Sequence, residues 1–158
     1  MTNALGNSVR LLCLAGSLFL CITGLAACGD SSVPEADADP LDQRGQWTFV
    51  NYWAEWCKPC IQEIPELNAL HELEGYRVLG VNFDGARGEA LEAQLSALGV
   101  AFPTLAEDPA QRFELARPQV LPTTLVLTPD GDLAKVLVGP QTEESLLEWT
   151  RQLSPGEG

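Results

Sequence analysis

The sequence predicts an α/β three-layer sandwich, in which helices cover both faces of a central mixed sheet. Two observations lead to this fold class. Buried-strand patterns alternate with amphipathic helical patterns from Trp47 onward, and a terminal hairpin and helix follow them. The chain has 158 residues, of which 46% are hydrophobic, and this is enough for one domain with a substantial core.

The first expected strand is WTFVNYW, residues 47–53, because β-branched and aromatic residues dominate it. A helix should follow from Cys57 to about Leu73, where apolar side chains recur at every third position. Pro65 lies inside this helix and is expected to kink it. YRVLGVNF, residues 76–83, is a second buried-strand pattern, so a strand, a helix and a strand follow one another.

The second half of the chain continues the alternation. GEALEAQLSALG, residues 88–99, predicts an amphipathic helix that ends at its final glycine. A short strand or extended piece at 100–105 and a short helix at 109–116 are expected next. Residues 123–139 predict two strands around a Pro-Asp-Gly turn, and residues 142–153 predict a last helix.

The N-terminal segment has the features of a secretory signal. Arg10 is the one charged residue before an apolar run at 11–27. This run ends in LAAC, residues 25–28, and small residues before a cysteine mark a cleavage site that resembles a bacterial lipobox. We therefore predict a lipoprotein-type signal peptide at 1–27 and lipidation of Cys28.

An uncleaved membrane anchor is the alternative, although the apolar run falls short of the ~20 residues that usually span a bilayer. With either anchor the folded part lies outside the cytoplasm, so the expected location is the periplasmic side of a bacterial membrane. Residues 28–46 should form a lipid-anchored acidic linker. Within it, residues 30–46 are acidic and poor in large apolar residues, so we expect a flexible tether there. Residues 47–153 should form the folded domain, and 154–158 a flexible tail.

The protein is strongly acidic, with a formal net charge of −13. All 22 acidic residues lie after Cys28, whereas Arg10 is lost with the leader. Such a negative net charge repels phosphate groups, so it argues against nucleic acid or an anionic lipid surface as a partner.

Five cysteines are present, but only Cys57 and Cys60 remain as a working pair. Cys13 and Cys21 lie in the apolar leader, and Cys28 would carry lipid. An oxidising compartment permits disulfides, so something must set the redox state of the remaining pair.

Cys57 is expected at the N-terminus of a helix, where unpaired N–H groups and the helix dipole favour thiolate over thiol. A separation of three residues lets the two sulfurs meet within one helical turn. Cys57 is expected to be exposed and to attack, and Cys60 to resolve the mixed disulfide. Pro59 limits backbone freedom between them, and Lys58 adds a positive charge that favours the thiolate.

Two other roles for this pair are open. A closed structural zinc site needs four ligands, and the other candidates are His71 and the lipid-bearing Cys28. A purely structural disulfide that closes so short a loop stabilises little. A catalytic or regulatory dithiol is therefore favoured, with no metal and no cofactor.

WAEWCKPC, residues 53–60, resembles the active-site segment of the thioredoxin family, and VLPTT, residues 120–124, resembles the proline loop of that fold. The resemblance implies a thioredoxin-like three-layer sandwich, with Pro122 in a cis peptide and lying against the two sulfurs. It also implies a substrate-contacting surface next to the dithiol. The residues expected there are Trp56, Lys58, Pro59, Leu121 and Thr123; packing is the alternative role for Trp56.

More narrowly, VNYWAEWCKPCIQEIPEL is similar to the signature of membrane-tethered, extracytoplasmic reductases of the TlpA/ResA type, which include those of cytochrome c maturation. The resemblance covers roughly residues 47–153. It implies that Glu63 lies near the sulfurs and relays a proton when Cys60 is released, in a site where Asn51 cannot titrate. The alternative for Glu63 is a solvent-facing helix acid. The chain departs from the family at Val120, where a glycine is common, and in lacking an extra strand or hairpin before Trp47.

The expected function is extracytoplasmic thiol:disulfide oxidoreduction, and the family favours reductase over oxidase or isomerase. The expected partners are disulfide-bearing proteins, with apocytochrome c as one candidate, and a membrane thiol that donates electrons. The protein is expected to be a monomer.

Other classes with this fold are less well matched. A peroxidase would have proline and threonine where Val50 and Ala54 stand, and a copper-delivery protein would have a late histidine. A non-catalytic binding module remains the alternative from a different class.

Overall fold

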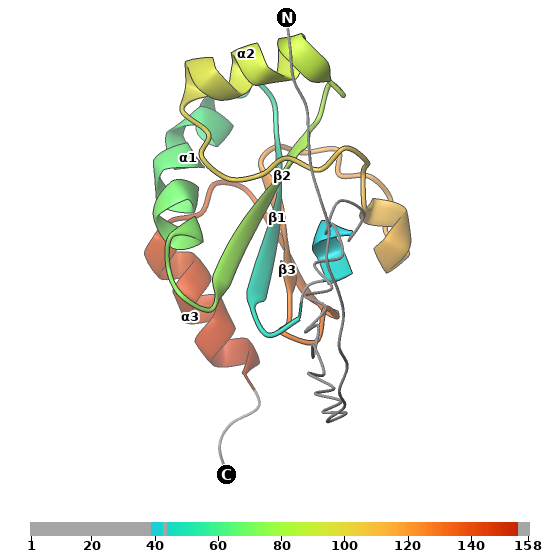
Figure 1. Ribbon diagram of the computed structural model, residues 1–158. Helices are drawn as coiled ribbons and strands as arrows, with labels where there is room; N and C mark the ends of the chain where they lie inside the picture. Colours follow the sequence, from blue (N-terminus) through green and yellow to red (C-terminus); the bar gives the residue numbers. More distant parts are fainter. Residues whose placement is uncertain (1–38, 43, 155–158) are drawn as a thin grey trace, which may run out of the picture. The chain divides into compact units, whose positions relative to one another are not determined.

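A four-stranded mixed sheet forms the centre of the domain (Figure 1). The computed structural model describes residues 39–42 and 44–154. The elements of the described chain are η1 (Pro40–Asp42), β1 (Trp47–Trp53), α1 (Lys58–His71), β2 (Tyr76–Asn82), α2 (Gly88–Leu98), η2 (Ala110–Phe113), β3 (Thr123–Leu127), β4 (Leu133–Val138) and α3 (Glu143–Leu153), where η denotes a 3₁₀-helix.

The strand order is β2-β1-β3-β4. β1 pairs in parallel with β2 and antiparallel with β3, and β3 pairs antiparallel with β4. β1 lies inside the sheet and all its residues after Trp47 are buried, as its β-branched and aromatic residues predicted. The predicted mixed sheet and terminal hairpin are therefore confirmed.

Helices α1 and α3 pack side by side on one face of the sheet (Figure 1). Apolar residues recur at every third or fourth position of α1, and this stripe faces the strands. Leu67 and Leu70 are therefore fully buried there. Leu146 of α3 joins the same cluster, together with Phe49 and Val126 from the sheet. The predicted α1 continues through Pro65, which lies inside the helix with an exposed side chain.

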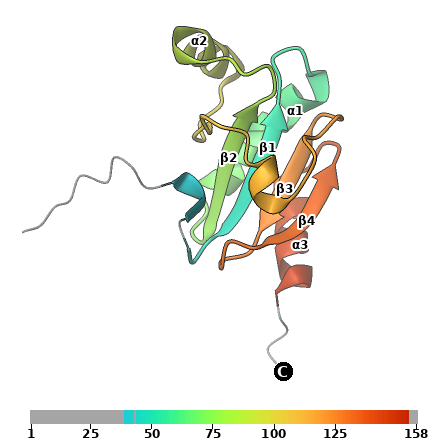
Figure 2. The ribbon, with the colours of Figure 1, turned by 90° about the vertical axis from the view of Figure 1, so that its right-hand side faces the viewer.

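The other face of the sheet is covered by η1, η2 and their connecting loops; Figure 2 shows η2 in front of the strands and η1 beside β2. Leu41, Leu105, Phe113 and Leu115 pack there against the strand side chains. Helices were expected on both faces, but among residues 39–42 and 44–154 the helices on this face are 3₁₀-helices. The sequence predicted an ordinary short helix where η2 stands.

Helix α2 lies beyond the ends of β1 and β2 (Figure 1). None of its residues is fully buried, but Leu91, Leu95 and Leu98 pack against the cluster that contains Cys57 and Cys60. Its predicted end is confirmed, since Gly99 adopts the left-handed conformation with φ of 68°. This helix therefore packs on the cluster that contains the two cysteines rather than on a sheet face.

The start of the described chain is held against the domain. Leu41 is only 6% exposed, and Arg112 pairs with both Asp39, at 2.6 Å, and Asp42. The expected flexible tether at 30–46 is therefore wrong for residues 39–42, because one apolar side chain and two carboxylates within this acidic run have partners in the fold. The predicted signal peptide, Cys28, the rest of the tether up to residue 38 and most of the tail lie outside the described residues.

Within residues 39–42 and 44–154, no helix is both long enough and apolar enough to cross a membrane.

Gly80 of β2 allows the predicted extended piece at 100–105 to lie against the sheet. Its N–H donates to the Pro103 carbonyl at 2.7 Å, and Leu105 N–H donates to the Gly80 carbonyl at 2.8 Å. A Cβ at this position would lie 2.9 Å from both Thr104 Oγ1 and Trp53 Nε1. Only glycine leaves room for this close approach.

We therefore expect Gly80→Ala to lower the free energy of unfolding by about 1–3 kcal/mol, as overpacking does in a close-packed interior. Urea unfolding measures the change. The double variant Gly80→Ala/Thr104→Ala loses one of the two close contacts and should recover part of the stability. A Gly80→Ala protein as stable as the wild type would contradict this packing.

Candidate functional site

The two predicted cysteines lie where β1 ends and α1 begins. Cys57 is the N-cap of α1, and its Sγ accepts a hydrogen bond from Cys60 N–H at 3.3 Å. The N–H groups of the first helical turn have no partner within the helix, so a sulfur at this position takes the place of a capping oxygen. Any negative charge on that sulfur is stabilised by the same N–H groups.

Cys57 and Cys60 form a disulfide, with their Cα atoms 5.3 Å apart. Pro59, at the second position of the helix, is partly buried, whereas Lys58 is exposed. The one-turn spacing thus brings the two sulfurs into bonding contact, as the sequence predicted.

The disulfide is buried, which corrects the prediction that Cys57 is exposed. Cys57 is 4% exposed and Cys60 is 1% exposed. Both pack with Trp53 and Ala54 in one cluster, against which the leucines of α2 and Leu121 also lie. The sequence showed the helix start, but not the side chains from other elements that cover it.

The proline loop approaches the same cluster. The Leu121–Pro122 peptide is cis, as the resemblance implied, and Pro122 is buried. The Thr123 hydroxyl donates to the Val120 carbonyl at 2.7 Å and closes the loop on itself. Val120, at the position where a glycine is common, is 55% exposed. Leu121 therefore faces the dithiol cluster, whereas Val120 adds an exposed apolar side chain to the rim.

Glu63 lies in the interior, one helical turn beyond Cys60. Its side chain is 2% exposed, so a solvent-facing role is excluded. Asn51 Nδ2 donates to Glu63 Oε1 at 2.6 Å, and the Gln141 N–H donates to Glu63 Oε2 at 2.8 Å. Asn51 Nδ2 also donates to Thr124 Oγ1 at 3.0 Å. One carboxylate therefore connects α1 with β1 and with the chain that leads into α3.

Burial raises the pKa of Glu63 from 4.5 to about 7. The hydrogen bonds from Gln141 and Asn51 act in the opposite direction, because they favour the carboxylate, and they offset only part of the effect of burial. Side chains three residues apart on a helix are neighbours, so this group lies close to Cys60. An acid with a pKa near 7 can both take and give a proton at neutral pH.

Trp56, next to Cys57, is 61% exposed. Its ring makes an edge contact with Phe83, with ring centroids 6.3 Å apart and planes at 88°. Its Nε1–H donates to Asp84 Oδ2 at 2.9 Å. Trp56 thus packs against Phe83 while most of its side chain faces solvent, and its contact with a partner stays a prediction.

Three residues of this site were missed by the sequence reasoning. Gln141 and Thr124 hold the buried Glu63–Asn51 pair, and Phe83 supports Trp56. Gln141 is 78 positions from Glu63 and acts through its backbone N–H, which leaves no signal in residue type.

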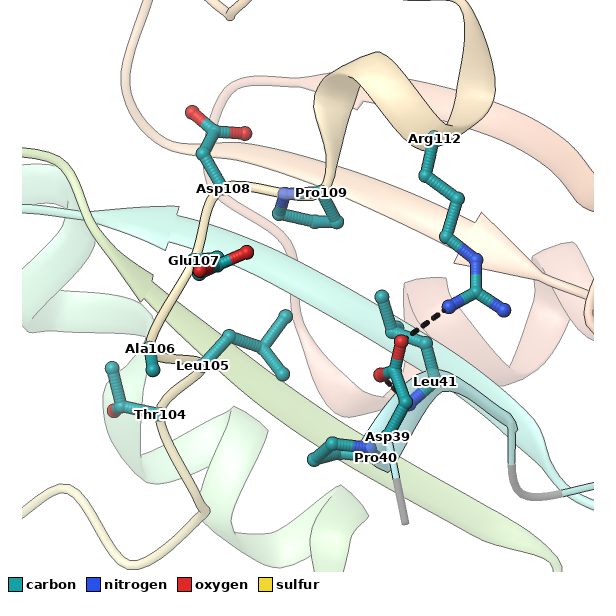
Figure 3. Close-up of a pocket in the computed structure, with 10 residues that line it drawn as sticks. All are labelled: Asp39, Pro40, Leu41, Thr104, Leu105, Ala106, Glu107, Asp108, Pro109 and Arg112. Carbon is teal, nitrogen blue, oxygen red and sulfur yellow. Dashed lines mark hydrogen bonds and ion pairs between the residues drawn. The ribbon is translucent and has the colours of Figure 1, made fainter. Parts of the chain in front are cut away.

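A cavity of about 510 Å³ lies away from the disulfide, between η1 and residues 104–109 (Figure 3). Arg112 and Asp39 pair across one side of it. Cys57, Cys60 and Pro122 are not among the residues that line it. The cavity is therefore separate from the disulfide at the β1–α1 junction.

Comparison with known proteins agrees with this geometry. The model of the AhpC/TSA family matches residues 33–136. The thiol-disulfide oxidoreductase ResA of Bacillus subtilis is 29% identical over 119 residues, which are 73% of this chain and 66% of that protein. ResA of Geobacillus thermodenitrificans is 30% identical over 117 residues, which are 72% of this chain and 67% of that protein. The chain thus spans about two thirds of the length of these relatives.

Among solved structures, StoA of Bacillus subtilis superimposes with a TM-score of 0.54 at 27% identity, covering 68% of this chain and 84% of StoA. The thioredoxin-like fold expected from the sequence is thereby confirmed.

The raised pKa of Glu63 makes the stability of the oxidised protein depend on pH. The folded state holds this proton more tightly than the unfolded state, so the contribution is fully present below pH 4.5 and is lost as the pH rises through about 7. We expect the stability of the wild type, relative to Glu63→Gln, to fall by roughly 3 kcal/mol across this window. Urea unfolding at pH 4.5 and pH 8 measures the difference.

Glu72→Gln is the matched control, because Glu72 is an exposed acid at the end of the same helix. It should leave the pH dependence unchanged. Parallel pH profiles for the wild type and Glu63→Gln would show that Glu63 does not titrate in this window.

Proposed function

Because the chain belongs to the AhpC/TSA family, whose members share the thioredoxin-like fold described above, we propose that it is a thiol:disulfide oxidoreductase acting through Cys57 and Cys60. The observation that carries this proposal is the Cys57–Cys60 disulfide at the N-terminus of α1, with the proline loop on one side and the Glu63 carboxyl one turn beyond. The names of the relatives, thiol-disulfide oxidoreductases, support the same chemistry.

The proposed reaction starts from the reduced protein. The Cys57 thiolate attacks one sulfur of a disulfide in the partner, a mixed disulfide forms, and the other partner sulfur leaves as a thiolate. Cys60 then attacks the Cys57 sulfur, the Cys57–Cys60 disulfide closes, and the second partner sulfur leaves. Two electrons pass from the dithiol to the partner, and a dithiol donor of the membrane restores them.

Glu63 supplies the proton path for the second step. Cys60 is a buried thiol in the mixed disulfide and must lose its proton before it attacks, and a carboxylate one turn along the same helix can accept that proton. The Glu63 pKa near 7 suits this exchange, because at neutral pH the carboxyl group is populated in both its protonated and its ionised form.

The proposed direction is reduction of partner proteins, which follows from the resemblance to TlpA/ResA-type reductases, and apocytochrome c is one candidate substrate. Oxidase and isomerase use the same two steps in other directions. The catalytic residues proposed are Cys57, Cys60, Glu63 and Pro122. The proposed substrate-contacting residues are Trp56, Lys58, Pro59, Leu121 and Thr123.

We place the protein outside the cytoplasm, anchored through lipid on Cys28. The sequence features that support this are the apolar run and the LAAC ending. The proposed organisation is a signal peptide at 1–27, an anchored linker from 28 and a folded domain up to 153. The packing of residues 39–42 on the domain shortens the free part of that linker.

A peroxidase activity is not favoured, although the family model carries the name of peroxide-reducing proteins. Val50 and Ala54 stand where that reaction needs proline and threonine, and both are buried apolar residues. Neither can donate a hydrogen bond from its side chain to a peroxide oxygen. A non-catalytic binding module is the alternative that the first experiment below decides.

Cys60→Ser should trap the partner as a mixed disulfide on Cys57, since the resolving thiol is removed. Non-reducing electrophoresis and mass spectrometry of the adduct measure this. Cys57→Ser/Cys60→Ser is the control and should trap nothing. If Cys57→Ser retains full function in cells and Cys60→Ser forms no adduct, the protein is a binding module.

Glu63→Gln should slow the resolution of the mixed disulfide by about 100-fold, at the low end of general acid–base effects, and remove an inflection near pH 7. Stopped-flow tryptophan fluorescence across pH 5.5–8.5 follows the step. Glu72→Gln again serves as the control. A Glu63→Gln profile with the wild-type inflection would remove Glu63 from the mechanism.

Cys28→Ser should release the protein from the membrane fraction of expressing bacteria, because lipid is attached to that sulfur in the proposed mature form. Fractionation, with metabolic labelling by a fatty-acid analogue, measures both membrane binding and lipid. A Cys28→Ser protein that stays in the membrane fraction would favour the uncleaved anchor.

A further inference from the structure

Trp56 faces solvent next to Cys57, and its orientation is set by few contacts. Its exposed fraction is 61%, so burial does not hold the ring in place. The two contacts of its side chain come from the residues directly after β2, where the Phe83 ring makes a T-shaped contact with the indole and Asp84 accepts from the indole N–H. Whatever fixes Phe83 therefore also fixes the indole beside the reactive sulfur.

Arg117 contacts Phe83 at both its ring and its backbone. Its guanidinium carbon lies 4.3 Å from the centroid of the Phe83 ring, which is within cation–π range. The same guanidinium donates a hydrogen bond to the Phe83 carbonyl. Arg117 thus holds both the ring and the backbone of one residue, from a segment that leads into the proline loop.

Arg117 is in turn anchored in the core of the domain. Its Nε pairs with Asp108 Oδ2 at 2.9 Å. Asp108 Oδ1 accepts from the Tyr52 hydroxyl at 2.7 Å and from the Ala110 N–H at 2.9 Å. Tyr52 is fully buried in β1, so the contacts run without a break from the central sheet to Phe83.

We propose that Arg117 is a positioning residue for substrate recognition, which holds Phe83 against Trp56 so that the indole presents its open face beside Cys57. This rests on the proposed oxidoreductase function and deepens it. A broad aromatic face gives contact area to the chain that flanks a cysteine, so the preferred substrate class is a disulfide within a polypeptide. A small disulfide presents little surface beyond its own sulfurs to use that contact.

The test compares steady-state reduction of insulin with reduction of oxidised glutathione, with dithiothreitol as the electron source. Arg117→Ala should raise KM for insulin about fivefold, as the loss of one partly exposed cation–π contact implies, with a smaller change in kcat. The loss for oxidised glutathione should be smaller than that for insulin. Arg151→Ala is the matched control, since Arg151 is an exposed arginine that pairs with Glu148 on α3, and it should behave as the wild type.

A double-mutant cycle separates positioning from general damage to the fold. If Arg117 acts through the indole, Arg117→Ala should add little in a Trp56→Ala background, whereas independent structural losses would multiply. Phe83→Leu keeps apolar bulk but removes the ring, so it should reproduce the KM change and carry the test if Arg117→Ala does not fold.

The outcomes distinguish the two levels of the proposal. A wild-type protein that reduces neither substrate would overturn the proposed function itself. A wild-type protein that reduces both, with Arg117→Ala and Phe83→Leu unchanged in KM for insulin, would overturn only the role of Arg117. Equal losses on insulin and oxidised glutathione, or losses that multiply with Trp56→Ala, would do the same.

Discussion

The structure depends on how a buried carboxyl group is held. Glu63 is almost fully enclosed, and a buried acid is tolerated only when it is hydrogen-bonded or protonated. Its two oxygens accept from Asn51 of β1 and from the Gln141 N–H before α3, while Asn51 also reaches Thr124 of β3. The first helix is thereby joined to two strands and to the start of the last helix. The dithiol stands at the beginning of that same helix.

The site divides into a protected interior and an open rim. Both cysteines and Glu63 are buried, so the disulfide and this carboxyl group each lie in an environment of low polarity. That environment gives Glu63 a pKa near 7. Lys58, Trp56 and Val120 lie outside it and are exposed. The two cysteines and the Glu63 carboxyl thus lie in the interior, and these exposed side chains form the rim around them.

The strands, the three α-helices and the pairing of Cys57 with Cys60 could be predicted, because periodicity, turn residues and the C-x-x-C spacing are local signals. The cis state of Pro122 came only from the family resemblance. Burial of Cys57 was missed because its cluster is completed by side chains of α2 and the proline loop, which are distant in sequence. The packing of Leu41 was missed within an acidic run, since a single apolar residue there gives no periodic pattern.

An equilibrium redox titration of the purified protein, with differential alkylation of Cys57 and Cys60 read out by mass spectrometry, tests the central claim most directly. The account predicts that both thiols appear together along one reversible two-electron transition as the ratio of reduced to oxidised glutathione or dithiothreitol is raised. Two cysteines that never become alkylated together, or that respond independently and irreversibly, would contradict a dithiol that exchanges electrons.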